Sequence, residues 1–313
     1  MGIIPAMIVL AVVSYIVNRY YSSKIQLSRP EITIKEVFNE GTQMFSLGTV
    51  LMMASLIGTI TSYIINVYIR QYGSLNDVGL YQAATSITNQ YVGLIFASMA
   101  MDYFPRLAAM SNNRIKMQEV VIHQLDIVML IIVPILIGIM VTAPLIIRVL
   151  LTKEFLPIIP MLRWLVLGLF FKAFSYPIGY VSFSKGDKKT FLWFEGIFGN
   201  IVNLTFSIIS YRVWGLLGLG IAYTATYILY TTILSVIVKE RYNISINSLC
   251  MKMITPLFMA VFISFIIFQI NQYMYLSYML SILILIAITI YSYKELNKRI
   301  AIKEFVLLKL KKK

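Results

Sequence analysis

Long apolar segments, separated by short polar ones, run the whole length of the chain. Each is long enough to cross a hydrocarbon layer of about 30 Å, for which a helix needs roughly 20 apolar residues. The runs are too long, and alternate too little, for the strands of a closed β-barrel. The pattern therefore predicts an all-α polytopic membrane protein with about nine transmembrane helices, at residues 2–18, 43–69, 79–104, 126–150, 158–183, 190–211, 214–238, 253–271 and 273–293.

Several of these segments carry polar residues at helical spacing. In the third, Gln82, Ser86, Asn89 and Gly93 share one helical face. Lipid offers such a face no hydrogen bonds, so it must contact protein or a water-filled cavity. Helix packing explains any single stripe of small polar residues, but several stripes with amides favour a shared polar cavity. The candidate substrate-binding amides are Gln82, Asn89, Asn66, Asn200 and Asn203.

Lys172 lies in the middle of the fifth segment, in a stripe with Gly168, Ser175 and Gly179. It is about 16 Å from either end at 1.5 Å per residue, too far for its side chain to reach the interface. A charge at this depth costs about 2.5–3.5 kcal/mol. Water, a carboxylate, an anionic substrate or loss of the proton would offset that cost. Arg163 lies nearer the outer end, where it either reaches the interface or lines an outer vestibule.

Three acidic residues lie near the inner ends of their segments: Glu195, Asp102 and Asp126. Each is either half of a salt bridge at the membrane boundary or a carboxylate that couples transport to protons or cations. Glu195 differs in depth from Lys172 by roughly 9 Å, which argues against a direct pair. Arg106 marks the cytoplasmic boundary of the third segment.

Composition and charge support a membrane protein. Apolar residues make up 59% of the chain, charged residues 13%, and the net charge is +14. The loops on one side of the membrane hold 21 of the 27 basic residues, so this side is predicted to be cytoplasmic, with the C-terminus. Membrane topology thus explains the excess of basic residues, and nucleic acid binding is not needed to account for it. The short loops and lack of large soluble domains suggest a bacterial inner membrane.

Signals for an enzyme or a cofactor are nearly absent. The chain has one cysteine, Cys250, and one histidine, His123, so it predicts neither an internal disulfide nor a zinc cluster. It also lacks a glycine-rich phosphate loop and a nucleophile elbow. We therefore expect a protein that is not an enzyme and needs no cofactor or metal.

Three further expectations concern local structure. Residues 28–31 followed by residues 32–38 suggest a short interfacial helix. Residues 300–313 form a basic amphipathic tail that lies either on the anionic leaflet or in solvent. The segment at 214–238 carries a face of small residues, Gly218, Ala222 and Ala225 or Thr226, which indicates helix packing. Nine spans and a cytoplasmic C-terminus put the N-terminus outside, which is also the pattern of a chain whose first spans are missing.

Several motifs resemble the Wzx-type O-antigen and polysaccharide flippases. They are YGSLNDVGLYQA at residues 72–83, MDYFPRL at 101–107, GY at 179–180, KG at 185–186 with FLWFE at 191–195, and WGLLGLG at 214–220. This family belongs to the superfamily of multidrug extruders and the lipid II flippase, with two helical lobes around a cavity. The resemblance implies that residues 1–42 are the last helix of a mostly missing first lobe with a cytoplasmic linker. Residues 43–238 would form the six-helix second lobe, 239–293 an added pair, and 294–313 a basic tail.

The resemblance implies a flippase that moves an undecaprenyl-diphosphate-linked oligosaccharide from the inner to the outer leaflet. Its partners would be that substrate and membrane lipids, with the polysaccharide polymerase and chain-length proteins as further candidates. Lys172 and Arg163 would attract the diphosphate, and the amides would bind sugar hydroxyls. The alternatives are a membrane-embedded glycan polymerase or glycosyltransferase, a drug exporter of the same superfamily, and an inactive truncated half-transporter.

Overall fold

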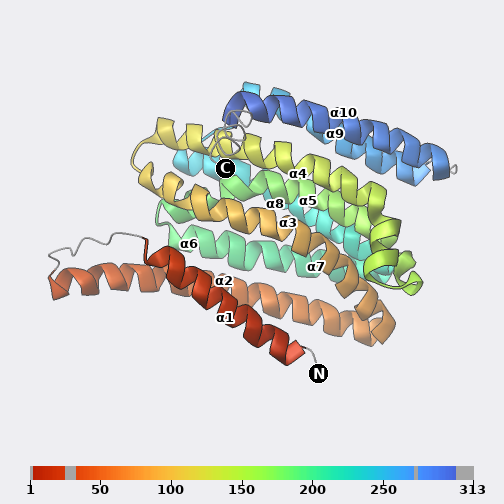
Figure 1. Cartoon of the computed structure of the whole chain (residues 1–313), viewed down its shortest axis with the longest axis horizontal. Coiled ribbons are helices and arrows are strands. Elements are labelled where there is room, and N and C mark those ends of the chain that lie inside the picture. The colour runs from red at the N-terminus through yellow and green to blue at the C-terminus, as the bar shows by residue number, and fades with distance from the viewer. Residues whose placement is uncertain (1–2, 25–32, 271–273, 301–313) are drawn as a thin grey trace. The chain divides into compact units, whose positions relative to one another are not determined.

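The computed structural model describes residues 3–24, 33–270 and 274–300, and the regular elements in these ranges are helices (Figure 1). The long ones are α1 (Ile3–Ser22), α2 (Ile34–Tyr72), α3 (Leu75–Ala109), α4 (Arg114–Leu150), α5 (Ile159–Ser184), α7 (Gly199–Trp214), α8 (Leu216–Tyr242), α9 (Ser248–Ile270) and α10 (Met274–Ile300). Short elements are the 3₁₀ helix η1 (Lys153–Ile158), α6 (Lys188–Phe191) and the π-helical η2 (Leu192–Phe198).

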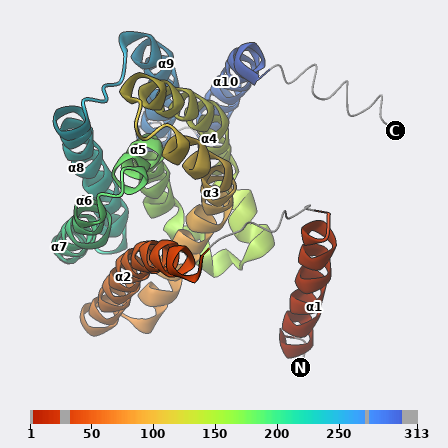
Figure 2. The ribbon, with the colours of Figure 1, turned by 90° about the vertical axis from the view of Figure 1, so that its left-hand side faces the viewer.

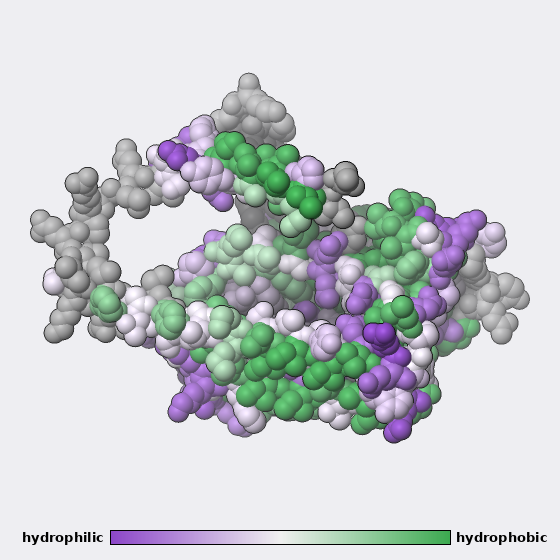
Figure 3. Space-filling model, turned by 90° about the horizontal axis from the view of Figure 1, so that it is seen from below, coloured by the Kyte–Doolittle hydropathy of each residue, from purple (hydrophilic) through white to green (hydrophobic). Residues whose placement is uncertain are grey.

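The predicted all-α membrane architecture is confirmed. Eight helices of the described ranges are long and apolar enough to span a membrane. The third predicted span is also helical, as α3, but it is not among these eight, because polar residues lower its hydropathy. Figure 3 shows apolar side chains spread broadly over one face, with hydrophilic ones gathered toward its ends, as a lipid-facing surface requires.

The described part of the interfacial helix predicted at residues 32–38 is helical, but it forms the start of α2 and is not a short helix of its own. Helix α2 begins at Ile34 and continues without a break to Tyr72, because nothing between the amphipathic start and the apolar span interrupts the helix. Residues 28–32, and the predicted amphipathic tail from residue 301 onward, lie outside the described residues.

Contacts divide the chain into two compact units, residues 1–46 and 47–313. In the first unit, the side chains of α1 described by the structure are all exposed. In the second unit, α5 occupies the centre and packs against α3, α4, α8 and α9. Helices α9 and α10 run side by side along α4 (Figure 1). Apolar side chains of α4 and α5 form most of the principal core, as expected for helices surrounded by other helices.

Glycines set the close packing of α5 against α8. A Cβ on Gly220 would lie 2.7 Å from the carbonyl oxygen of Met161, and one on Gly168 would lie 3.1 Å from the Cα of Thr224. Without side chains at these positions the two backbones approach closely, which is the usual way for helices to associate in lipid. The close α5–α8 contact positions the polar groups described next.

Candidate functional site

A small polar pocket of about 100 Å³ lies where η2 and α7 pack against α8. Its lining combines one carboxylate, two amides, three phenols and a hydroxyl. These residues are Glu195, Asn200, Asn203, Tyr223, Tyr227, Tyr230 and Thr226, with Gly199 completing the wall. Such a collection of hydrogen-bonding groups among membrane-spanning helices is costly unless it serves a structure or a ligand.

Lys172 adjoins this pocket from α5. Its ammonium group interacts electrostatically with the phenols of Tyr223 and Tyr227, and Nζ lies 5.5 Å from the centroid of the Tyr227 ring. No carboxylate of the described residues lies within 4.0 Å of it, since the ion pairs of these residues involve other lysines and arginines. Phenol oxygens and aromatic faces, rather than a salt bridge, therefore accommodate this deep cation.

Glu195 reaches the opposite end of the tyrosine cluster. It lies in the π-helical η2, a local widening of a helix that is frequent at functional sites. Its Oε1 accepts a hydrogen bond from the hydroxyl of Tyr230. A Cβ on Gly179 would lie 2.7 Å from this oxygen, so the glycine of α5 provides the room for the carboxylate. The residue lines the polar pocket, so a ligand in that pocket would lie next to it.

The two amides of α7 differ in their bonding. Asn200 donates from Nδ2 to the carbonyl oxygens of Gly196, at 2.7 Å, and Glu195, at 3.1 Å, which holds the transition from η2 into α7. Asn203 accepts a longer bond from Ser207, at 3.5 Å. Asn66 of α2 has a buried Oδ1 with no hydrogen-bond partner in the described structure, which is uncommon for a buried polar atom.

The other amides predicted to bind substrate are not in the pocket. Gln82 and Asn89 lie exposed on α3. Near the end of the same helix, Asp102 and Arg106 form an exposed ion pair at 2.6 Å, and Arg106 also donates to Gln124 of α4 at 3.3 Å. The α3 stripe therefore faces away from the packed interior of the second unit.

Arg163 lies on α5 about 13 Å along the helix axis from Lys172 at 1.5 Å per residue, and it does not line the pocket. Its guanidinium stacks on Phe268 of α9, with Cζ 4.1 Å from the ring centroid, and donates to the Phe268 carbonyl oxygen at 3.4 Å. It thus fastens α9 to α5.

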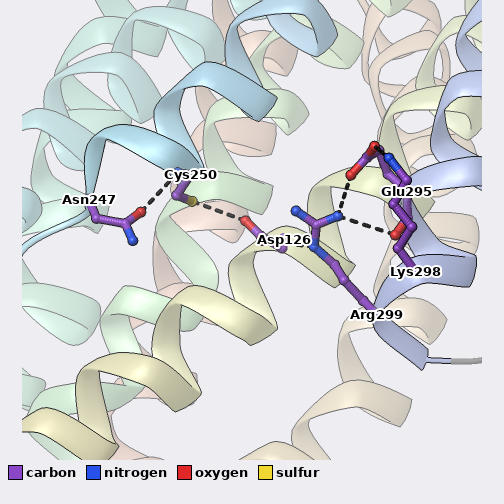
Figure 4. Close-up of polar contacts among 6 residues, drawn as sticks. All are labelled: Asp126, Asn247, Cys250, Glu295, Lys298 and Arg299. Atoms are coloured by element: carbon purple, nitrogen blue, oxygen red, sulfur yellow. Dashed lines mark hydrogen bonds and ion pairs between the residues drawn. The ribbon is translucent and has the colours of Figure 1, made fainter.

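Asp126 is likewise outside the pocket, in a network that joins α4, α9 and α10 (Figure 4). Its carboxylate accepts from Arg299 of α10 at 3.0 Å and from the Cys250 thiol of α9 at 3.1 Å. Arg299 also pairs with Glu295 at 2.6 Å. Of the three carboxylates proposed for ion coupling, only Glu195 therefore lies beside the Lys172 cluster.

Sequence reasoning missed the phenols. Tyr223, Tyr227 and Tyr230 follow one another at spacings of four and three on α8, and their aromatic rings are in contact along the helix, with centroids 4.8 Å and 6.1 Å apart. This spacing is visible in the sequence, but the small residues of the same segment predict a packing face. Both descriptions hold, because Gly218, Gly220, Ala222 and Thr226 are also buried.

Comparisons with solved structures identify the fold. One match is a lipid II flippase, MurJ, in an inward closed conformation, with a TM-score of 0.60 and 19% identity over 89% of this chain and 58% of that chain. Another is an outward-facing MATE family multidrug resistance transporter of the MOP superfamily, with a TM-score of 0.55 and 16% identity over 73% of this chain and 53% of that one. No curated protein matches by sequence. The chain spans little more than half the length of these structures.

The fold is thus similar to that of this lipid II flippase and this MATE family transporter. A sequence family described as "Polysaccharide biosynthesis protein" matches residues 3–160, half of the chain. The protein belongs to this polysaccharide biosynthesis protein family.

Proposed function

We propose that the protein is a flippase for a lipid-linked oligosaccharide of polysaccharide biosynthesis. The observation that carries the proposal is Lys172, a deep lysine beside phenols and amides that forms no ion pair within 4.0 Å with a carboxylate of the described residues. Such a cation suits an anionic group brought by a substrate. Membership of a polysaccharide biosynthesis family and the fold of a lipid flippase support this substrate class.

The substrate would be an undecaprenyl-diphosphate-linked repeat unit of O-antigen, capsule or exopolysaccharide. Lys172 would attract the diphosphate, while Asn200 and Asn203 would bind sugar hydroxyls near it. The exposed stripe of α3, with Gln82 and Asn89, and Asn66 of α2 would extend the polar surface along which the glycan crosses. The contacts of Arg163 with α9 favour a structural role for that residue over diphosphate binding.

Glu195 is the carboxylate we assign to ion coupling. It is connected to Lys172 through the tyrosine row, and it lines the polar pocket. Asp102 and Asp126 are engaged by arginines and suit structural roles. Transport would follow rocking of one helical lobe against another, with residues 43–238 as one lobe. The basic ends of the helices, including the C-terminus, would face the cytoplasm from a bacterial inner membrane.

A complementation assay tests the role of Lys172. In a strain that lacks its surface-polysaccharide flippase, the Lys172→Ala variant should fail to restore the polysaccharide, while membrane insertion stays at the wild-type level. Lys172→Arg should restore part of the activity, because it keeps the charge. The matched control is Lys252→Ala, which removes an exposed lysine near the start of α9 and should behave as wild type. Full activity of Lys172→Ala would refute the diphosphate role.

A reconstituted assay separates this function from the alternatives. Vesicles holding the full chain should move a fluorescent lipid-linked oligosaccharide between leaflets without transferring sugar from a nucleotide sugar. Sugar transfer would instead indicate a glycosyltransferase or polymerase, and export of a cationic dye a drug exporter. Absence of any movement, in protein that is folded and inserted, would indicate an inactive half-transporter.

A further inference from the structure

Helices α8 and α9 follow one another in the chain but make almost no direct contact. Figure 2 shows them standing apart, joined by the segment after Tyr242. Both pack instead against α5, which lies behind the space between them. The result is a slot open on one side, with α5 as its floor and α8 and α9 as its walls.

The slot has a volume of about 240 Å³ and an aromatic floor formed by Phe170, Phe171 and Phe174 of α5. Phe258 adds a fourth ring from the α9 wall. For scale, a cavity of about 150 Å³ with apolar walls holds a benzene molecule. The space is therefore large enough for part of a hydrocarbon chain.

The slot offers water little to bind. Three threonines line it, but each hydroxyl donates to a backbone carbonyl: Thr231 to Phe171 at 3.1 Å, Thr232 to Ile228 at 2.8 Å, and Thr255 to Met251 at 2.8 Å. A buried water molecule needs two to four polar partners. The surface that remains is apolar, so within a bilayer a lipid chain is the favoured occupant.

A second, separately lined cavity lies nearer the basic end of α8. Ser235 and Lys239 line this space of about 200 Å³. They follow Ile228 and Thr232 on the same face of α8, at spacings of three or four residues. The Lys239 side chain is exposed, and it takes part in none of the ion pairs of the described residues. The face of α8 that lines the slot thus carries an available positive charge farther along, at Lys239.

We propose that this slot is a binding site for an anionic phospholipid from the leaflet at the basic end of the bundle. One acyl chain lies between α8 and α9 against the phenylalanines, and the phosphate lies beside Lys239. The lipid fills the space that the two helices leave and links the α9–α10 pair to α8. This site is separate from the Lys172 pocket and does not depend on the transported substrate.

The test is lipid binding to the purified full chain, measured by native mass spectrometry after delipidation and addition of phosphatidylglycerol. Wild type should bind one phosphatidylglycerol more tightly than the others. Thr232→Trp, which fills the slot, should weaken this binding at least tenfold. Lys239→Ala should weaken it about fivefold, the effect of one basic residue near an anionic surface, and remove the preference over phosphatidylcholine. Ile209→Trp on the exposed side of α7 and Lys294→Ala on α10 are the matched controls and should change neither.

Three results would overturn the proposal. The first is unchanged phosphatidylglycerol binding in Thr232→Trp that keeps wild-type helicity. The second is a preference for phosphatidylglycerol that survives Lys239→Ala. The third is tighter binding of a polyprenyl phosphate than of phosphatidylglycerol at the same slot. If Thr232→Trp does not fold, Thr255→Trp fills the slot from the opposite wall and gives the same comparison.

Discussion

Replacing Gly179 of α5 with alanine should displace the side chain of Glu195, which lies on η2. The new Cβ would lie 2.7 Å from Oε1 of Glu195 but 3.9 Å from the nearest carbon atoms, Glu195 Cδ and Leu234 Cδ2. The backbone of α5 therefore has room for the methyl group, and only the carboxylate must move. Because Oε1 is the atom that accepts from the Tyr230 hydroxyl, the displacement should break that hydrogen bond.

The size of the effect follows from two opposing contributions. Alanine is more favourable than glycine inside a helix by about 1 kcal/mol. A hydrogen bond to a charged group contributes about 1.5–3 kcal/mol. The free energy of unfolding of Gly179→Ala should therefore fall by about 0.5–2 kcal/mol. In a Tyr230→Phe background, where the bond is already absent, the same substitution should be neutral or stabilising.

The assay is reversible denaturation in mixed micelles of wild type, both single variants and the double variant. The two substitutions should be strongly non-additive, because they remove the same hydrogen bond. Additive effects, within about 0.5 kcal/mol, would show that Gly179 does not act through Glu195. Transport by Gly179→Ala should fall together with that of Tyr230→Phe if the carboxylate position matters for coupling.

Three further substitutions test other parts of the structure. Gly220→Val should lower the free energy of unfolding by about 1–3 kcal/mol, because the valine Cβ would lie 2.7 Å from a backbone oxygen of α5. Gly138→Ala is the control and should not destabilise the protein, because a Cβ at residue 138 would have no atom within 4 Å. Arg299→Gln should lower the free energy of unfolding by about 2–3 kcal/mol in the same assay. This is less than the usual loss of about 3–5 kcal/mol for a broken buried ion pair, because the side chains of Asp126 and Arg299 keep 10% and 25% exposure. A variant as stable as wild type would contradict a role of this ion pair in attaching α10. Burial raises the pKa of the Asp187 carboxyl. Hydrogen bonds from neighbouring residues and the guanidinium of Arg241 lower this pKa by more, so that it lies below the ordinary value of 3.8. Its stabilisation is then complete above about pH 3.8 and is lost as the pH falls through the lower folded-state pKa, so Asp187→Asn should flatten the acid limb of a stability–pH profile, and an unchanged limb would argue against this.

The network at Asp126 shows what a sequence leaves open for a boundary charge. The residue's position near the inner end of α4 allowed either a salt bridge or an ion-coupling role. Arg299, its partner, is 173 positions away in the chain. No local rule links such residues, so only the packing of α10 against α4 could identify the pair. Arg163 is a similar case, because its contact with Phe268 spans 105 positions.

By itself, the sequence determined the all-α membrane architecture and the approximate limits of the spanning helices, because apolar length and helical periodicity are local properties. Its first half also matches the polysaccharide biosynthesis protein family. Only the tertiary structure decided which polar residues meet. Lys172, Glu195 and the tyrosines of α8 lie far apart in the chain, and the glycine-mediated approach of α5 to α8 brings them together. The slot between α8 and α9 has the same origin, since helix packing alone determines where two consecutive helices leave a space.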